Sequence, residues 1–299
     1  FGVALATPTI GRFQVLEKLG EGAMGEVFAA FDPELDRRVA IKVLHSSQDE
    51  TPDRHQRLIR EAQALARVSH PHVVQVFEVG VHRHHVFVAM EYVRGESLAQ
   101  RFVHASAPEP WTSVLQVFLA AGHGLAAVHA VGLVHRDFKP ANTIVGADGR
   151  VRILDFGLAR GTVAEGRDDG HCGASAPKRL DATLTAVGSI VGTPAYMAPE
   201  LFLGRRADAL SDQYSYCTAL YEALYGVRPH TGETIAALAD AKLAGRIIPL
   251  VGTKVPAWLH AAVVRGLSVA PERRWPSIPA LLAELGSDRR ARVRRWGTA

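Results

Sequence analysis

The sequence holds few of the residues that build disulfide-bonded, metal-bound or membrane-spanning proteins. Its two cysteines, Cys172 and Cys217, are too few and too scattered in 299 residues for a disulfide framework or a zinc site. No apolar run approaches the roughly 18 residues of a membrane helix, and the start lacks the charged-then-apolar pattern of a signal peptide. These absences indicate a reducing compartment, and we expect a cytoplasmic protein.

The chain also has little excess charge. The net charge of +4 comes from 34 basic and 30 acidic residues, and residues 288–295 hold five arginines against one aspartate. The remainder is balanced, whereas nucleic-acid-binding domains spread basic residues along one face, so we expect no nucleic-acid partner. The 289–295 arginine cluster has two interpretations: a solvated, disordered end, or the flank of a membrane helix beyond residue 299, on the cytosolic face of the inner membrane.

Apolar residues make up 47% of the chain, an ordinary share for a globular protein. They are arranged first in strand-like patterns. After a loose leader at 1–11, alternating and β-branched residues predict strands at 13–16, 26–31, 38–44, 73–79 and 86–90. Thr51 and Pro52 are typical of a helix start, and the apolar spacing that follows predicts a helix over 52–68.

After Gly95 the apolar residues follow helical spacing. This pattern predicts helices at 111–130, 211–225, 233–244, 256–267 and 276–285. Strands first and helices later are typical of an α+β arrangement with two segregated lobes, here 12–93 and 94–286, followed by a basic tail at 287–299.

Two neighbouring segments carry the polar groups that phosphoryl transfer requires. Residues 135–142 (HRDFKPAN) offer a carboxylate, Asp137, an ammonium, Lys139, and an amide, Asn142; Asp155 then adds a second carboxylate. Moving a phosphoryl group from a Mg²⁺-bound nucleotide to a hydroxyl needs a base, metal ligands and neutralisation of the transferred charge. This set of residues suits that chemistry.

A glycine-rich turn precedes them. Residues 20–27 (GEGAMGEV) fit the pattern G-x-G-x-x-G-x-V, in which glycines let a hairpin lie close over phosphates and offer backbone N–H groups. A dinucleotide-binding turn shares the first six positions but leads into a helix, whereas residues 27–29 continue as a strand. A plain tight turn is the other alternative.

Lys42 ends the apolar strand 39–42 (VAIK), where a lysine usually extends to solvent. A functional role needs a carboxylate partner. Glu61, on the apolar side of the 52–68 helix, is the candidate, because a charge on that face is costly unless it is paired.

Together these segments resemble the protein-kinase signature. The glycine loop, VAIK, the helix glutamate, HRDFKPAN, Asp-Phe-Gly at 155–157 and Ala-Pro-Glu at 198–200 follow the family's order and spacing. Over roughly 12–286 the chain resembles the catalytic domain of a bacterial, eukaryotic-like (Hanks-type) serine/threonine protein kinase. The resemblance implies the two-lobed protein-kinase fold: a small, mainly antiparallel β N-lobe with one key helix, and a larger helical C-lobe.

The resemblance also implies roles for single residues. Lys42, held by Glu61, would bind the α- and β-phosphates of ATP; Asp137 would orient and deprotonate the substrate hydroxyl; Lys139 would neutralise the γ-phosphate. Asn142 and Asp155 would hold Mg²⁺, with Mn²⁺ as an alternative. The other nucleotide-binding positions would be Gly20, Glu21, Gly22, Ala23, Met24, Gly25 and Val27 from the first strands, Ala40, the back-pocket residue Met90, the hinge residues Glu91 and Val93, and Glu96 at the ribose.

The segment 192–200 (GTPAYMAPE) and Lys139 are the serine/threonine-type pattern, in which Thr193 would contact Asp137 and Lys139. Proteins with Ser or Thr acceptors are therefore the implied partners. Two alternatives stay open: a pseudokinase or scaffold, which would normally have lost Lys42, Asp137 or Asp155, and a small-molecule phosphotransferase of related fold.

Some residues are structural by resemblance. Glu200 should pair with Arg274, Asp212 should tie down the 135–142 segment from a buried helix, and His135 and Phe156 are better interpreted as packing residues than as acid–base groups.

The long activation segment, 155–200, suggests regulation. Arg136 precedes Asp137, which in the family often indicates activation by a phosphate that pairs with this arginine. Thr183, Thr185 and Ser189 are the candidate acceptors, Thr185 first, and self-association would permit trans-autophosphorylation. Asp168, Asp169, His171 and Cys172 match no standard metal-ligand spacing and are interpreted as solvated loop.

Overall fold

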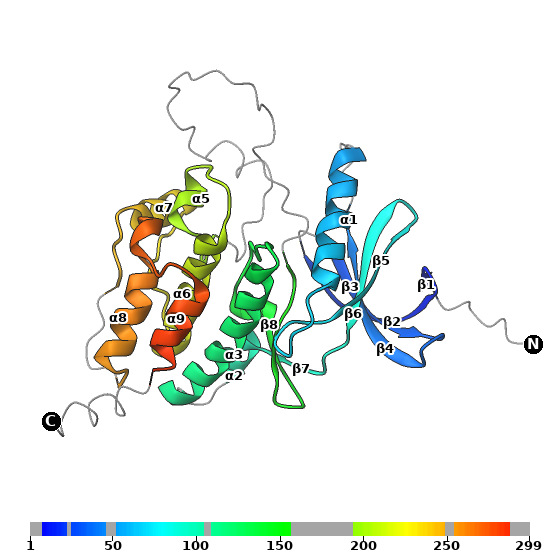
Figure 1. Cartoon of the computed structure of the whole chain (residues 1–299), viewed down its shortest axis with the longest axis horizontal. Coiled ribbons are helices and arrows are strands. Elements are labelled where there is room, and N and C mark those ends of the chain that lie inside the picture. The colour runs from blue at the N-terminus through cyan, green and yellow to red at the C-terminus, as the bar shows by residue number, and fades with distance from the viewer. Residues whose placement is uncertain are drawn as a thin grey trace, which may run out of the picture.

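The computed structural model describes residues 8–22, 25–45, 52–104, 109–156, 194–248 and 254–287. Figure 1 shows a β-rich lobe built from the first part of the chain and a helical lobe built from the second. The predicted two-lobed α+β arrangement is confirmed.

The N-lobe is a six-stranded antiparallel sheet with the order β1-β2-β3-β4-β6-β5. Its strands are β1 (Thr9–Ile10), β2 (Phe13–Gly22), β3 (Gly25–Asp32), β4 (Arg37–Leu44), β5 (Val76–His82) and β6 (His85–Glu91). One face buries a cluster that includes Ile10, Phe13, Ile41 and Phe87. Because Ile10 is part of this cluster and β1 pairs with β2, the expectation of a loose leader up to residue 11 is wrong at Thr9 and Ile10.

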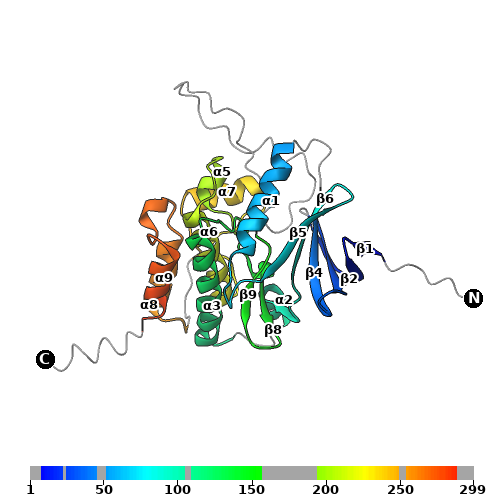
Figure 2. The same ribbon diagram turned by 45° about the vertical axis from the view of Figure 1, so that its right-hand side comes forward.

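Helix α1 (Pro52–Ala66) covers the sheet on the side of β5 and β6, as Figures 1 and 2 both show. Its buried residues Leu58, Ala62 and Leu65 follow helical spacing and pack in the same core as Val76 and Val88. Glu61 lies beside this apolar stripe on the same helix.

The C-lobe begins with a small antiparallel sheet, β7 (Gly95–Ser97), β8 (Thr143–Gly146) and β9 (Val151–Ile153), which the sequence analysis did not predict. Its helices are α2 (Leu98–His104), α3 (Trp111–Ala130), α5 (Pro199–Phe202), α6 (Ala209–Tyr225), α7 (Ile235–Leu243), α8 (Ala257–Gly266) and α9 (Ile278–Leu285). The 3-10 turns η1 (Pro140–Asn142) and η2 (Pro271–Arg273) complete the lobe. The five predicted helices are confirmed within two residues at each end.

Helix α6 forms the centre of the C-lobe. It begins at a capping box in which the Asp208 side chain accepts from the Leu210 and Ser211 N–H groups, and it ends at Gly226, whose φ of 72° favours glycine. Eleven consecutive residues, 211–221, are buried. A helix buried on all sides is a rigid support for what it carries, here Asp212 and Tyr214.

Helix α3 is an exception to the statement that no apolar run in the sequence approaches the length of a membrane helix. Its 20 residues contain no acidic residue, lysine or arginine, so by length and composition it could cross a membrane. In the structure it contacts α6, α9 and β9, and Phe118, Leu125 and Val128 are buried there. Its apolar composition is therefore that of a core helix.

Candidate active site

A cleft of about 630 Å³ lies between the two lobes. Its volume falls within the range of about 300–1,000 Å³ that is usual for small-molecule sites. The N-lobe, the hinge after β6 and the loops around β8 and β9 all contribute to its wall, which comprises Leu19, Gly20, Glu21, Gly22, Gly25, Val27, Ala40, Lys42, Met90, Glu91, Tyr92, Val93, Asp137, Lys139, Ala141, Asn142, Ile144, Leu154 and Asp155.

The glycine turn forms the roof through the β2–β3 hairpin. Gly25 has a φ of 149°, and a Cβ there would lie 2.0 Å from the carbonyl oxygen of Val43, so the neighbouring strand requires glycine. A Cβ on Gly20 or Gly22 would meet no protein atom within 4 Å. These two glycines therefore leave open space at the cleft, where phosphates could approach the backbone.

Lys42 and Glu61 do not pair in this structure, contrary to the prediction. The Lys42 Nζ lies 2.8 Å from Asp155 Oδ1, across the cleft, and the Glu61 carboxylate instead pairs with Arg136 at 3.0 Å. Lys42 is buried on β4, while Glu61 and Arg136 are each partly exposed. The resemblance implied a Lys42–Glu61 pair, with Asp155 as a metal ligand and Arg136 as the partner of a phosphate; here Asp155 and Arg136 take the two places in that pair.

The loop that carries Asp137 is fixed from below by α6. Asp212 Oδ2 accepts from the His135 backbone N–H at 2.7 Å, and Oδ1 accepts from that of Arg136 at 2.8 Å. Arg136 has a φ of 66°, an unfavourable left-handed conformation for a residue with a long side chain. The Asp212 contacts stabilise this strained backbone, and the predicted role of Asp212 is confirmed.

His135 is a packing residue, as predicted. Its ring is fully buried against Phe138 and Phe156, and its Nε2 lies 2.9 Å from the Leu154 carbonyl oxygen. Burial lowers the pKa of His135, which favours the neutral imidazole. The Asp137 N–H donates to His135 Nδ1 at 3.3 Å, so the ring supports the loop rather than exchanging protons with a substrate.

Asp137 lies at the base of the cleft with its carboxylate held in place. Its Oδ2 accepts from Lys139 Nζ at 2.7 Å and from Asn142 Nδ2 at 3.2 Å. The Asn142 amide also donates to the Asp137 carbonyl oxygen at 2.9 Å. Asn142 thus uses its NH₂ group within the loop, which leaves its side-chain oxygen for a metal ion.

The donor set fits Mg²⁺ and a nucleotide. An amide oxygen from Asn142 and a carboxylate from Asp155 are hard ligands of the kind Mg²⁺ uses together with substrate phosphates. Among the residues that the structure describes, no group of three or more His, Cys, Asp or Glu side chains could hold a metal alone. Val27, Ala40, Met90 and Leu154 supply the apolar wall that an adenine ring requires.

The hinge after β6 is held by a residue that the sequence analysis missed. Arg152, buried on β9, lies 3.1 Å from the Glu91 carboxylate and also forms a two-pronged pair with Asp148, at 2.7 and 3.1 Å. The guanidinium thereby connects the hinge to the β8–β9 turn. Arg152 stands between the apolar residues Val151 and Ile153 on this strand. An arginine in an alternating pattern is expected to face solvent, since Arg is usually exposed, so the sequence analysis did not predict its burial.

The structure brings most of the predicted site residues to the cleft. Gly20, Glu21, Gly22, Gly25, Val27, Ala40, Lys42, Met90, Glu91, Val93, Asp137, Lys139, Asn142 and Asp155 all line it. Glu96 does not: it lies on β7, opposite Val145. Ala23, Met24, Thr183, Thr185, Ser189, Thr193 and the 289–295 cluster lie outside the described residues.

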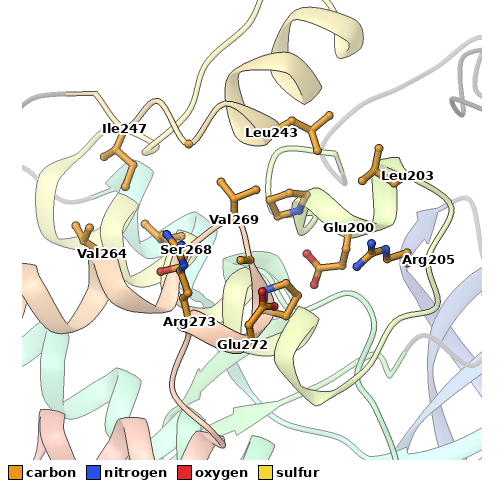
Figure 3. Close-up of a pocket in the computed structure, with 15 residues that line it drawn as sticks. Glu200, Leu203, Arg205, Leu243, Ile247, Val264, Ser268, Val269, Glu272 and Arg273 are labelled. Atoms are coloured by element: carbon orange, nitrogen blue, oxygen red, sulfur yellow. The ribbon is translucent and has the colours of Figure 1, made fainter. Parts of the chain in front are cut away.

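A second groove, of about 520 Å³, lies in the C-lobe between α5, the end of α7 and the segment after α8 (Figure 3). It is lined by Leu203, Leu243, Ile247 and Val269 among others, with Arg205, Glu272 and Arg273 at its edge. None of the predicted phosphate or metal residues contributes to it, so it is separate from the transfer site.

Comparison with known proteins agrees with this geometry. Residues 13–260 match the family described as "Protein kinase domain". This chain belongs to the protein kinase family. The crystal structure of the Mycobacterium tuberculosis PknI kinase domain superposes with a TM-score of 0.67 at 26% identity, covering 95% of this chain and 98% of that one. The protein-kinase fold is therefore confirmed.

The kinase is also similar to curated bacterial proteins. It is 36% identical over 225 residues to serine/threonine-protein kinase pkn2 of Myxococcus xanthus, covering 74% of this chain and 25% of that protein. It is 33% identical over 280 residues to serine/threonine-protein kinase PknB of Mycobacterium tuberculosis, covering 92% of this chain and 42% of PknB. The kinase chain thus spans less than half the length of these two relatives.

Proposed function

We propose that this chain is the catalytic domain of a bacterial serine/threonine protein kinase, which transfers the γ-phosphate of ATP to Ser or Thr hydroxyls of proteins. The convergence of Asp137, Lys139, Asn142 and Asp155 at the base of one cleft, facing Lys42 and the glycine turn, carries this proposal. A pseudokinase is disfavoured because each of these groups is present and lies at the cleft.

The mechanism follows from the roles these side chains can perform. ATP supplies the phosphoryl group, and Mg²⁺ neutralises its charge when both are bound. Asp137 orients the incoming hydroxyl and accepts its proton. Lys139, 2.7 Å from the Asp137 carboxylate, places a positive charge beside the path of the transferred group. Asn142 and Asp155 would hold the metal ion, and Lys42 would contact the α- and β-phosphates.

The observed ion pairs support a regulatory proposal. Arg136 pairs with Glu61, and Lys42 pairs with Asp155. A phosphate on Thr183, Thr185 or Ser189, with Thr185 first, would compete with Glu61 for the Arg136 guanidinium, because an arginine can bind a phosphate through two hydrogen bonds. Glu61 would then be released to pair with Lys42. Autophosphorylation between two copies of the chain would supply that phosphate.

We propose domain boundaries that follow the two lobes. The N-lobe would extend to residue 93, the C-lobe from 94 to 286, with the activation segment at 155–200 and a basic tail at 287–299. We place the domain in the cytoplasm; the arginines of the tail would flank the inner membrane if a membrane helix follows residue 299, and would otherwise be a solvated end.

The direct test is to incubate the purified chain with Mg²⁺ and ATP labelled in the γ-phosphate, with and without dephosphorylated casein. We expect label on phosphoserine and phosphothreonine of casein, and phosphate within residues 181–190 of the chain by mass spectrometry, with activity rising as this phosphate accumulates. Label that appears on no protein, or a lack of transfer altogether, would contradict the kinase assignment. An active chain with 181–190 unmodified would contradict the regulatory part alone.

A further inference from the structure

The hinge, residues 91–94, is a thin wall with open space on both sides. Glu91, Tyr92 and Val93 line the nucleotide cleft of about 630 Å³, and the same three residues line a second hollow of about 390 Å³. Ala147 and Asp148 of the β8–β9 turn also line this outer hollow. Because such a wall has few packed neighbours, its position depends on the specific contacts that hold it.

Backbone hydrogen bonds hold the two ends of the hinge. The Glu91 N–H donates to the Gln75 carbonyl oxygen at 2.9 Å, and the Arg94 carbonyl oxygen accepts from the Ala147 N–H at 2.7 Å. Between these ends, the Val93 N–H has no acceptor within the part of the chain that the structure describes. It is therefore available to a ligand in the cleft that Val93 lines.

One side chain holds the hinge from the outer side. Arg152, on β9, is only 7% exposed, and its guanidinium lies 3.1 Å from the Glu91 carboxylate and 2.7 and 3.1 Å from the two oxygens of Asp148. Its hydrogen bonds hold the pKa of Asp148 well below the usual range, so the aspartate stays charged. Because a guanidinium is a rigid fork, Arg152 fixes the spacing between the hinge and the turn.

The turn also packs against the hinge at this point. A Cβ on Gly146 would lie 3.3 Å from Val93 Cγ1 and 3.0 Å from Arg152 Nη1, so the backbone, the guanidinium and the hinge side chain are in close contact. After β9 the chain continues through Leu154 and Asp155, which both line the cleft. Arg152 therefore joins the hinge to the segment that carries the proposed metal ligand.

Stability alone does not explain an arginine at this position. Burying a guanidinium costs desolvation, and replacing a buried ion pair with apolar side chains is often neutral or stabilising. The Glu91 side chain is 31% exposed, so water could solvate its carboxylate without Arg152. What the arginine supplies is a fixed geometry, which an apolar side chain would not give to a wall with hollows on both sides.

A fixed hinge matters for the choice of base. Adenine presents an acceptor at N1 and an amino donor at position 6, whereas guanine presents an N1–H donor and a carbonyl acceptor. A backbone N–H held in one place is satisfied by adenine N1 but meets a second donor in guanine. Sites built to hydrogen-bond one ligand reject an analogue that lacks the partner, provided that the site does not shift to accommodate it.

We propose that Arg152 is a positioning residue for the base of the nucleotide: by holding Glu91 to the β8–β9 turn, it fixes the Val93 N–H in the cleft and thereby sets the preference for ATP over GTP. This role rests on the proposed kinase function and extends it to a residue outside the cleft wall. Arg152 acts through the hinge and does not touch the nucleotide.

The test is to titrate the wild type and Arg152→Met with ATP and GTP analogues that carry a fluorophore on the ribose, in the presence of Mg²⁺. We expect the Kd for the ATP analogue to rise about tenfold and that for the GTP analogue to stay within about twofold, so the preference falls about tenfold. In casein phosphorylation, KM for ATP should rise in parallel, while kcat at saturating ATP stays within about twofold, because Asp137 and Lys139 are unaffected.

Three further variants isolate the contact. Arg150→Met is the matched control: this exposed arginine lies 3.8 Å from Asp148 on the same turn, and its loss should leave both affinities unchanged. Glu91→Gln removes the charge at the hinge but keeps the Arg152–Asp148 pair, so it should lower the preference as Arg152→Met does. The double variant should lose no more than either single variant, because both remove one interaction.

The outcomes separate this role from the kinase assignment. A loss shared equally by the two nucleotides, an unchanged preference, additive losses in the double variant, or a wild type without preference for ATP would overturn the role of Arg152. A change in denaturation midpoint without a change in preference would do the same. If Arg152→Met does not fold, Glu91→Gln decides by the same criterion. A wild type that prefers ATP but transfers no phosphate to casein would contradict the kinase function alone, since the binding measurements still decide the role of Arg152.

Discussion

Asp137→Asn is expected to lower the rate of phosphoryl transfer by roughly 10²- to 10⁴-fold, the usual contribution of a general base. The amide is nearly isosteric with the carboxylate and can still accept from Lys139 and Asn142, which now hold Asp137 Oδ2 at 2.7 and 3.2 Å. The loop should therefore keep its shape while losing the group that takes the proton. Single-turnover transfer to casein measures the loss.

Nucleotide binding should persist in this variant. The Lys42 ammonium, the glycine turn and the apolar wall of the cleft are unaffected, so a fluorescent ATP analogue should bind with an affinity close to that of the wild type. Asp36→Asn, in the exposed turn between β3 and β4, is the matched control: its φ of 47° is one that asparagine adopts readily, and transfer should be unchanged. Equal transfer rates in wild type and Asp137→Asn would remove Asp137 from the catalytic assignment.

Each part of the cleft is a short local segment that the sequence shows, and the resemblance to the protein-kinase family supplied their meeting at one site. Within the glycine turn 20–25, the backbone conformation and close contacts of Gly25 require glycine. The close spacing of Asp137, Lys139 and Asn142 in the sequence places these three side chains on one loop. Alternating apolar residues placed Val27, Ala40 and Lys42 on adjacent strands, where the register now pairs Val27 with Lys42.

The partners of Lys42 and Glu61 could not be predicted in the same way. Besides Asp137 and Lys139, the charged groups Lys42, Arg136, Glu61 and Asp155 meet near the cleft, and the buried Lys42 could be paired by Glu61 or by Asp155. The choice depends on the position of α1 relative to the C-lobe, which no local pattern of residues encodes. The resemblance to the family implied the Lys42–Glu61 pair, whereas the structure has Lys42 with Asp155 and Glu61 with Arg136.

Long-range contacts account for the remaining differences. Thr9 and Ile10 are too short a segment to indicate a strand until β2 is present to pair with them. Glu96 was assigned to the ribose by resemblance, which stays a prediction; its place on β7 is set by pairing with Val145 of β8, distant in the chain. Lys242, which is buried on α7, had no sequence signal, because it donates to the backbone carbonyls of Ala195 and Met197, and backbone carbonyls have no residue preference.

Arg274→Met is expected to destabilise the folded chain by about 3–5 kcal/mol, the usual result of removing one partner of a buried ion pair. Arg274 is 1% exposed and Glu200 is 6% exposed, and the guanidinium contacts both carboxylate oxygens at 2.7 Å. It also donates to the carbonyl oxygens of Leu210, Ser268 and Val269. The predicted Glu200–Arg274 pair is thus confirmed as the junction of α5, α6 and the segment after α8.

Loss of the guanidinium would leave the buried Glu200 carboxylate and three carbonyl groups without this donor, which is why the cost should exceed that of an ordinary core substitution. Urea unfolding at pH 7 measures it. Lys18→Met, which removes an exposed pair with Glu21 and Glu26, is the matched control and should change stability little.

Adding Glu200→Leu to Arg274→Met should recover part of the lost stability, since the unpaired Glu200 charge is then removed as well. If the double variant were less stable by the full sum of the two single changes, the ion pair would not be the source of the stabilisation, and the carbonyl contacts of Arg274 would account for it.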